Sequence, residues 1–302
     1  MKRRKVTTTS LGAMKRRGEK ITMITAYDAT FARLLDDAGA DILLVGDSLG
    51  MVICGEENTL SVTMDAMTYH CAAVSKGRKH ALVVGDMPFL SFQISPEDAL
   101  RNAGRLLSAG HAEAVKIEGG RSQAHTVRKL VGAGIPVMGH LGLTPQSVHQ
   151  LGGFRTQGQQ PDQASAILED AKILEDSGCF SLVLECIPGD LAREVSQTLT
   201  IPTIGIGAGP ACDGQVLVCY DMLGLNDSFR PKFLKQFALL ADVVRSSTRA
   251  FIDEVRNGQF PGPEQTIESA ATNGDSTRHR QSSYDITPLY GSVELGRQEE
   301  LS

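Results

Sequence analysis

The sequence predicts a single α/β domain folded as a (β/α)8 barrel, on three observations. The chain has 302 residues, and about 250 is typical of such a barrel. Its 31 glycines, 41% hydrophobic content and lack of tryptophan are typical of α/β proteins with many tight turns. Eight short apolar runs alternate with amphipathic segments, and eight parallel strands with intervening helices can close into a barrel. An open doubly wound sheet is the alternative, but such sheets usually have fewer strands.

The apolar runs have the signature of parallel strands, because each is continuous rather than alternating, as a strand buried on both faces requires. Glycines end the amphipathic segments before four runs, at Gly39, Gly110, Gly134 and Gly178, where a helix C-cap takes a left-handed residue. A helix start is readable at Ser95, which offers an N-cap before a proline. The predicted strands cover residues 22–26, 41–46, 81–85, 112–117, 136–140, 181–185, 202–207 and 215–220.

Charge is distributed unevenly along the chain. The net charge is −5, but residues 1–20 carry eight Lys and Arg against one Glu, so the body is acidic and offers no nucleic-acid face. We predict that the basic start forms a solvated first helix, because it lacks the apolar segment of a targeting peptide. After residue 262 the composition turns polar, which predicts a catalytic domain over 1–262 and a disordered tail over 263–302.

The cysteines and the hydropathy predict a cytoplasmic protein that makes no membrane contact. None of the six cysteines forms a C-x-x-C pair and no signal peptide precedes them, so reduced thiols are expected. No apolar run approaches the ~18 residues that a membrane span requires.

Five ionisable residues fall where predicted strands end: Asp47, Asp86, Glu118, His140 and Glu185. In a barrel, reactive groups come from these ends. Four carboxylates converging on one mouth would repel one another unless a cation lay among them. Oxygen ligands without a Cys/His cluster favour one Mg²⁺, which takes one or two carboxylates directly and leaves positions for substrate oxygens. That each acid merely caps the next helix is a fair alternative for one aspartate but not for all four.

Two further residues, Lys116 and Cys186, and the role of His140 refine this site. Lys116 lies two residues before Glu118, so both side chains face the barrel interior, although a lysine extended along the rim is an alternative. His140 is either a hydrogen-bond donor to a substrate oxygen or a satisfied core histidine. Cys186 follows Glu185 and should alternate to the opposite face, which argues against a cysteine nucleophile.

Eight motifs keep a common order and spacing over about residues 5–260: ITAYD (24–28), VGDSLGMV (45–52), GDMPF (85–89), VKIEGG (115–120), MGHLGLTPQS (138–147), GGFRTQG (152–158), LECIP (184–188) and GIGAGPACDGQVLVCYDMLGL (205–225). Together they resemble the ketopantoate hydroxymethyltransferase family. The resemblance implies a barrel of the phosphoenolpyruvate/pyruvate type. It also implies Mg²⁺-dependent transfer of a hydroxymethyl group from 5,10-methylenetetrahydrofolate to 3-methyl-2-oxobutanoate, the first step of pantothenate and coenzyme A biosynthesis. The assembly that it implies is a homo-oligomer, a decamer.

The resemblance also implies roles for individual residues. Asp47 becomes the direct metal ligand and contacts the substrate, and Ser48 beside it contacts the substrate carboxylate. Asp86 becomes the second carboxylate of the metal site and also binds substrate. Lys116 becomes a substrate contact, and Glu118 lies in the outer shell of the metal. The glutamate of the LEC motif, Glu185, becomes the catalytic base. The residues that bind folate are not implied.

Two other functions fit parts of the sequence. A 2-oxo-acid lyase or mutase of the phosphoenolpyruvate-barrel superfamily would use similar metal chemistry without folate, but it would usually carry a catalytic cysteine loop of the KKCGH type, which is absent here. A catalytically dead barrel that acts as a sensor would be expected to lose a site acid, whereas all four are present.

Overall fold

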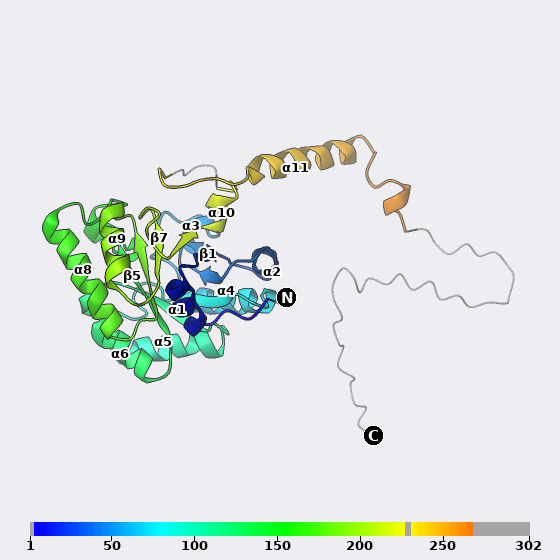
Figure 1. Cartoon of the computed structure of the whole chain (residues 1–302). Helices are drawn as coiled ribbons and strands as arrows, with labels where there is room; N and C mark the ends of the chain where they lie inside the picture. The colour runs from blue at the N-terminus through cyan, green and yellow to red at the C-terminus, as the bar shows by residue number, and fades with distance from the viewer. Residues whose placement is uncertain (1–2, 227–230, 268–302) are drawn as a thin grey trace, which may run out of the picture. The chain divides into compact units, whose positions relative to one another are not determined.

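The structure is a computed structural model that describes residues 3–226 and 231–267. The chain divides into two compact units, Met1–Thr248 and Arg249–Ser302. In the first unit eight parallel strands pair in sequence order, and β1 pairs with β8, so the sheet closes into a barrel (Figure 1). This confirms the predicted fold class. The strands are β1 (Ile21–Thr25), β2 (Ile42–Val45), β3 (Leu82–Asp86), β4 (Ala114–Glu118), β5 (Val137–Gly142), β6 (Ser181–Glu185), β7 (Thr203–Ile206) and β8 (Gly214–Leu217).

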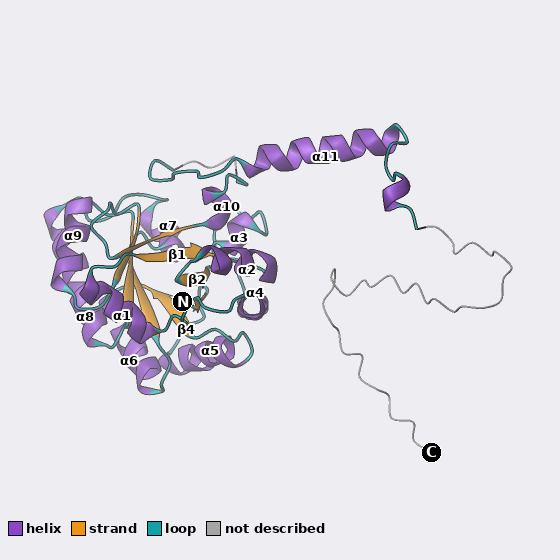
Figure 2. Ribbon diagram, turned by 45° about the vertical axis from the view of Figure 1, so that its right-hand side comes forward, coloured by secondary structure: helices purple, strands orange, loops and turns teal. Residues whose placement is uncertain are grey.

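Helices connect the strands and cover the outside of the barrel (Figure 2). In the first unit they are α1 (Thr8–Arg17), α2 (Ala29–Ala38), α3 (Leu49–Val52), α4 (Met64–Gly77), α5 (Pro96–Ser108), α6 (Ala124–Gly132), α7 (Val148–Leu151), α8 (Pro161–Asp176), α9 (Gly189–Thr198) and α10 (Cys219–Met222). Short 3₁₀ turns are η1 (Arg121–Gln123) and η2 (Pro145–Ser147). The helix α11 (Leu240–Arg256) spans the division between the units, and η3 (Pro263–Gln265) belongs to the second.

The glycine signals at helix ends are confirmed in three of four places. Gly39, Gly134 and Gly178 have φ of 110°, 84° and 100°. Gly110 does not, and the left-handed residue there is His111 with φ 56°. Gly110 has a different cause, because a Cβ at this position would fall 2.6 Å from a carbonyl oxygen of α5. The chain therefore needs glycine here for close packing rather than for its φ.

The last predicted strand is too long at its C-terminal end. The strand β8 ends at Leu217, whereas Cys219 and Tyr220 begin α10. The backbone N–H of Cys219 leaves the ladder and donates to Thr25 Oγ1 at 3.0 Å. Short apolar runs do not distinguish strand from helix by periodicity alone, which explains the error.

Side chains point alternately to the two faces of each strand and so form two apolar layers. One set points into the barrel and packs with Leu11 of α1: Ile21, Met23, Ile42, Leu44, Leu82, Val84, Ala114, Met138, Val183, Ile204 and Val216. The residues between them, such as Leu43, Val83 and Val115, pack against the surrounding helices. Continued by one or two pleats, four inward rows reach Asp86, Lys116 with Glu118, His140 and Glu185. The alternation that builds the core therefore aims these polar side chains into the mouth.

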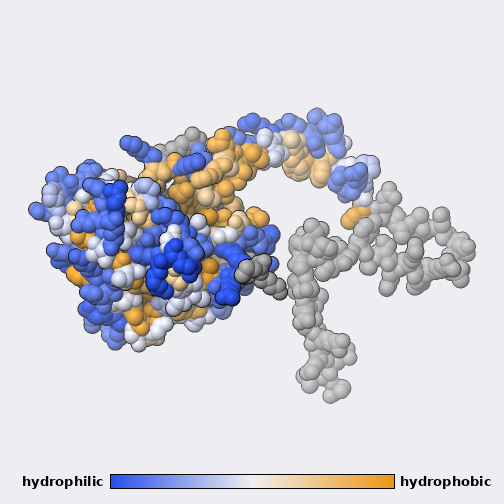
Figure 3. Space-filling view, in the orientation of Figure 1, coloured by the Kyte–Doolittle hydropathy of each residue, from blue (hydrophilic) through white to orange (hydrophobic). Residues whose placement is uncertain are grey.

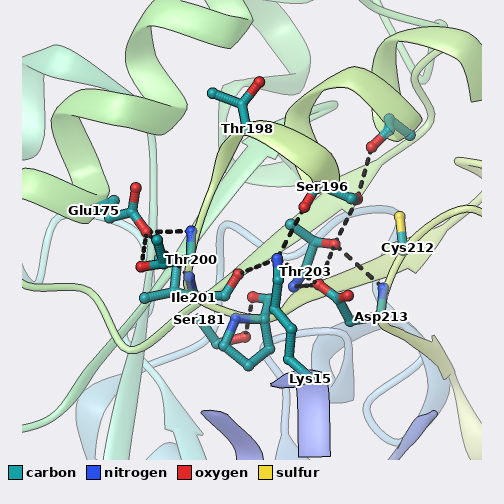
Figure 4. Close-up of polar contacts among 12 residues, drawn as sticks. Lys15, Glu175, Ser181, Ser196, Thr198, Thr200, Ile201, Thr203, Cys212 and Asp213 are labelled. Atoms are coloured by element: carbon teal, nitrogen blue, oxygen red, sulfur yellow. Dashed lines mark hydrogen bonds and ion pairs between the residues drawn. The ribbon is translucent and has the colours of Figure 1, made fainter. Parts of the chain in front are cut away.

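The first helix is not the solvated element that the charge pattern predicts. Leu11 of α1 is fully buried in the interior layer of the barrel. Lys15 donates to the carbonyl oxygens of Ser196 (2.9 Å) and Ile201 (2.8 Å) and pairs with Asp213 Oδ2 at 3.0 Å (Figure 4). Asp213 Oδ2 also accepts from the backbone N of Thr203 at 2.8 Å. The helix thus closes the N-terminal end of the barrel, and one of its basic residues serves to fix it there.

No helix within the described ranges is both long and apolar enough to cross a membrane. The predicted polar tail over 263–302 lies mostly outside the described residues, so it stays a prediction.

Asp36, at the C-terminal end of α2, anchors the segment that leads into β3. Its carboxylate accepts from the backbone N–H groups of Lys79 (2.7 Å), His80 (3.0 Å) and Ala81 (2.7 Å). Burial acts to raise the pKa of the Asp36 carboxyl, but these three donors and the charge of Arg3 outweigh it and lower the pKa. The ionised carboxylate therefore stabilises the fold.

We predict that Asp36→Ala lowers the melting temperature at pH 7 by roughly 5–10 °C, because buried N–H groups lose their acceptor. Since the folded pKa is depressed, this stabilisation is present above the unfolded pKa of about 4 and is lost as the pH falls through the folded pKa. Thermal melts at one protein concentration, from pH 8 to pH 3, test this. The control is Asp37→Ala, at the exposed neighbour on the same helix. Equal melting temperatures for the two variants would refute the assignment.

Candidate active site

All of the residues that the sequence predicts for the site line one cavity at the carboxyl ends of the strands. Its volume is about 1040 Å³. Strand register places two pairs of these residues side by side: Asp86 pairs with Lys116 across β3 and β4, and Glu118 pairs with His140 across β4 and β5. The predicted residues on the cavity wall are Asp47, Ser48, Asp86, Lys116, Glu118, His140 and Glu185.

A buried lysine lies among the carboxylates. Lys116 Nζ is 2.9 Å from Asp86 Oδ2 and 3.8 Å from Glu118 Oε1, and all three side chains are at most 5% exposed. It also lies 3.2 Å from His140 Nδ1. Asp47 is 4% exposed, and its backbone N–H donates to Asp86 Oδ2 at 3.3 Å. The lysine is therefore inside the cluster rather than extended along the rim.

The cluster perturbs the proton affinity of its members. Burial raises the pKa of Asp47 well above its ordinary value, and the charges of Asp86 and Glu118 raise it further. The pKa of Asp86 is also raised, by burial and the Glu118 charge, against the attraction of Lys116. Burial lowers the affinity of Lys116 for its proton, but the surrounding carboxylates outweigh burial and raise the pKa of Lys116. Three acids therefore share one lysine at close range.

Glu118 differs from the two aspartates. Burial acts to raise its pKa, but the hydrogen bond with His140 and the charge of Lys116 outweigh burial, so the pKa of Glu118 is lowered. Burial and Lys116 act to lower the pKa of His140, whereas Glu118 and Glu185 raise it to about 9. Glu118 is thus the acid of the cluster that is held most firmly in its ionised form.

His140 links the cluster to Glu185. His140 Nε2 lies 3.1 Å from Glu185 Oε2, and the Glu185 side chain is 17% exposed. The next residue, Cys186, lines the same cavity, so the expected alternation to the opposite face is wrong. The cause is its left-handed backbone, with φ 48°. Burial raises the pKa of the Cys186 thiol to about 12, so the thiol stays protonated at neutral pH, which agrees with its exclusion as a nucleophile.

Sequence reasoning overlooked two residues of the site. Gln146, in η2, is buried and donates from Nε2 to Asp47 Oδ2 at 2.9 Å. Tyr27 is buried, and its hydroxyl lies 2.9 Å from Ser48 Oγ. Both residues fall inside motifs that the sequence displays, MGHLGLTPQS and ITAYD. Neither is charged, and Gln146 lies four residues beyond the end of β5, although Tyr27 follows a strand as closely as Asp47 does.

None of the four acids caps a helix. The N-caps of the elements that follow them are Ser48, Ser95, Gly120 and Pro188. The capping alternative is therefore wrong, and the carboxylates need another explanation.

Two buried carboxylate oxygens, Asp86 Oδ1 and Glu118 Oε1, accept no hydrogen bond of good geometry from the described residues, although Glu118 Oε1 lies 3.5 Å from His140 Nδ1 and 3.8 Å from Lys116 Nζ. Such oxygens in a buried position call for water or a cation. Within residues 3–226 and 231–267, no group of three or more His, Cys, Asp or Glu side chains is arranged to hold a metal ion. Mg²⁺ needs no such group, because it typically keeps several waters and takes one or two carboxylates. The donor set fits Mg²⁺ with Asp47 and Asp86 rather than a cage made of protein alone.

A closed parallel barrel with ionisable residues gathered at the carboxyl ends of its strands defines an enzyme of the (β/α)8 class. Residues 5–263 match the family described as ketopantoate hydroxymethyltransferase. The chain is 56% identical over 260 residues to the 3-methyl-2-oxobutanoate hydroxymethyltransferase of Syntrophus aciditrophicus, covering 86% of this chain and 96% of that protein. It is 56% identical over 266 residues to that of Moorella thermoacetica, covering 88% and 99%. The chain belongs to the ketopantoate hydroxymethyltransferase family.

Solved structures show the same fold in more distant proteins. A 2,3-dimethylmalate lyase of the PEP mutase/isocitrate lyase superfamily aligns with a TM-score of 0.54 and 18% identity, covering 86% of this chain and 91% of that chain. A phosphonopyruvate hydrolase in complex with oxalate and Mg²⁺ aligns with a TM-score of 0.57 and 11% identity, covering 88% and 92%. These likenesses confirm the barrel type.

We predict that Asp47→Asn raises the melting temperature at pH 7 in the presence of a chelator, by roughly 2–4 °C. A carboxyl whose folded pKa is raised destabilises the fold above its unfolded pKa, so a neutral amide removes that repulsion. Thermal melts in EDTA measure the shift, with Asp65→Asn, an exposed aspartate of α4, as the control. A lower melting temperature than that of the wild type would show that Asp47 is not under electrostatic stress.

Proposed function

We propose that the chain transfers a hydroxymethyl group from 5,10-methylenetetrahydrofolate to 3-methyl-2-oxobutanoate, with one Mg²⁺ per subunit, and so forms ketopantoate. The family assignment supports the reaction, and the three acids around Lys116 support the use of a divalent cation. A dead barrel is disfavoured because every predicted site residue lines the cavity. A folate-independent lyase or mutase is disfavoured because the likeness to such proteins extends only to the fold.

The difference in exposure between Glu185 and the other acids carries the proposal for the catalytic base. Asp86 and Glu118 are 2% and 4% exposed, and both are close to Lys116. Glu185 is 17% exposed and lies on the far side of His140 from that lysine. A base must exchange its proton with solvent in every turnover, and a carboxylate engaged with a buried lysine would do so poorly. Glu185 is therefore the acid best placed to remove the C3 proton of the keto acid.

The remaining residues bind and orient the substrate. Asp47 and Asp86 would hold Mg²⁺ with Glu118 in its outer shell, and the ion supplies Lewis-acid stabilisation of negative charge on the substrate oxygens. Lys116 balances the negative charge that develops when the proton leaves C3. Ser48 contacts the substrate carboxylate, with its hydroxyl oriented by Tyr27. His140 donates a hydrogen bond to a substrate oxygen.

The size of the cavity supports a second, larger substrate. Pockets for whole drug-sized ligands typically have volumes of about 300–1,000 Å³. At about 1040 Å³, this cavity leaves ample space beside a small keto acid for a folate. The carbanion at C3 would attack the methylene carbon of that folate, and hydrolysis of the adduct would release ketopantoate and tetrahydrofolate.

The proposal is tested by incubating the full-length chain with 3-methyl-2-oxobutanoate and folate that is labelled in its methylene carbon. Labelled ketopantoate is expected in the presence of Mg²⁺ and should disappear on chelation. Turnover of the keto acid without folate would favour a lyase or mutase instead.

Two substitutions distinguish the proposed catalytic base, Glu185, from the proposed metal ligand, Asp47. We predict that Glu185→Gln lowers kcat by about 10²–10⁴-fold, as expected for loss of a general base, with little change in Mg²⁺ affinity. Asp47→Ala should lose Mg²⁺ binding first. Steady-state kinetics at several Mg²⁺ concentrations, combined with direct titration of the metal, distinguish these effects. Equal effects of both substitutions on the titration would show that the two roles are confused.

The proposal includes a cytoplasmic location and a homo-oligomer, the decamer that the family resemblance implies. The six cysteines are all free, which supports a reducing compartment. Apolar side chains lie exposed on α11 (Figure 3), including Val243 and Val244 of the first unit, which are 56% and 54% exposed. Contiguous exposed apolar surface is typical of association.

Analytical ultracentrifugation of the full-length chain is expected to give a particle of ten times the 32.4 kDa chain mass. A monomer at micromolar concentration would contradict the predicted assembly while leaving the proposed chemistry intact.

A further inference from the structure

Gln146 is a buried glutamine whose side-chain amide and backbone N–H are hydrogen-bonded at the carboxyl end of the barrel. It lies in η2 and is 5% exposed. Its Nε2 donates to Asp47 Oδ2 and to the Met87 carbonyl oxygen, both at 2.9 Å. Its backbone N donates to Glu118 Oε2 at 3.0 Å. Its Oε1 accepts from Gln93 Nε2 at 3.1 Å.

These contacts allow only one orientation of the amide. An amide NH₂ has two hydrogens, and both have acceptors here, while the amide oxygen has a donor. A reversed amide would set Oε1 against the Asp47 carboxylate and the Met87 carbonyl oxygen, and it would leave Gln93 without an acceptor. Gln146 is therefore fixed as a donor to Asp47 by contacts on both of its ends.

The same residue bridges three strand ends. Asp47 follows β2, Met87 directly follows β3, and Glu118 ends β4. In both carboxylates one oxygen is engaged by Gln146, so the plane of each carboxylate is held and its second oxygen is presented in a defined direction. Groups that orient metal ligands in this way typically contribute 10–100-fold to metal affinity or activity.

A neutral donor suits this position better than a cation. Lys116 already serves Asp86 and Glu118, and a second positive charge beside Asp47 would repel a divalent cation. An amide hydrogen bond stabilises the ionised carboxylate without adding charge.

We infer that Gln146 is a positioning residue for the metal site, which orients Asp47 and Glu118 before the metal and the substrate bind. This inference rests on the proposed role of Asp47 as a magnesium ligand. Gln146 touches the carboxylates rather than the reacting atoms, so its loss should appear first in the affinity for the metal.

The test measures binding of Mn²⁺, as a probe for Mg²⁺, to the full-length chain by electron paramagnetic resonance of the free ion. Gln146→Met keeps the approximate volume of the side chain but cannot donate. We expect its Kd for Mn²⁺ to rise 10–100-fold, with kcat at saturating metal less affected than Kd. The matched control is Gln215→Met, at an exposed glutamine whose side-chain Nε2 donates to the Gly209 carbonyl oxygen, away from the carboxylates of the site, and its Kd should equal that of the wild type.

A role in filling space alone predicts that Gln146→Met binds Mn²⁺ as tightly as the wild type does, and that result would overturn the inference. If the wild type itself does not bind Mn²⁺, the metal part of the proposed function fails first, so the two failures are distinguishable. Should Gln146→Met not fold, as judged by circular dichroism, Gln93→Ala decides, because it leaves Gln146 in place and removes the donor that fixes its amide. A roughly two- to tenfold rise in Kd would then support the inference, and an unchanged Kd would overturn it.

Discussion

Lys116 carries its charge into the interior of the barrel, where the side chain is only 5% exposed and water hardly screens it. An unpaired charge in that position would cost several kcal/mol, and so would each of the carboxylates around it. The lysine and the acids are therefore stable only as a set. With Asp47, Asp86 and Glu118 ionised, Lys116 and the imidazolium of His140 together still leave an excess of negative charge, which is the condition under which a divalent cation binds. The same lysine remains available to an anionic substrate.

The two ends of the barrel use polar groups in opposite ways. At the N-terminal end, Lys15 and Asp213 form a network with Thr203 and with main-chain carbonyls in which the lysine and the carboxylate are both engaged (Figure 4). At the carboxyl end, Asp86 Oδ1 and Glu118 Oε1 are buried and accept no hydrogen bond from the described residues. A network in which every polar group is hydrogen-bonded contributes to stability, whereas buried oxygens without a hydrogen bond are free to bind a ligand. This division agrees with the general rule that the N-terminal face of such barrels serves stability and the C-terminal face serves chemistry.

The sequence predicted those parts of the molecule that depend on local periodicity. The two-residue repeat of strands placed Lys116 and Glu118 on one face, and strand ends located the acids. Prediction from the sequence failed where contacts between distant parts of the chain determine the position of a residue. Gln146 binds Asp47 across 99 positions of the chain, from a turn that no strand pattern marks. Cys186 departs from alternation because its backbone is left-handed. The first helix was predicted to be solvated because many of its residues are basic, but Leu11 is buried and Lys15 pairs with Asp213.

The fold alone does not separate this family from a lyase and a hydrolase with the same barrel, because those proteins align with TM-scores of 0.54 and 0.57 although they are only 18% and 11% identical in sequence. The arrangement of the site suggests where the distinction lies. The charges that can bind a metal and a small keto acid come from the ends of β2, β3 and β4, and such a half-site would serve many reactions of 2-oxo acids. Glu185 comes from β6, and its side chain contacts His140, which in turn contacts Lys116 and Glu118. On the proposed function, the choice of which bond is broken would depend on this second half, where the partly exposed Glu185 lines the cavity.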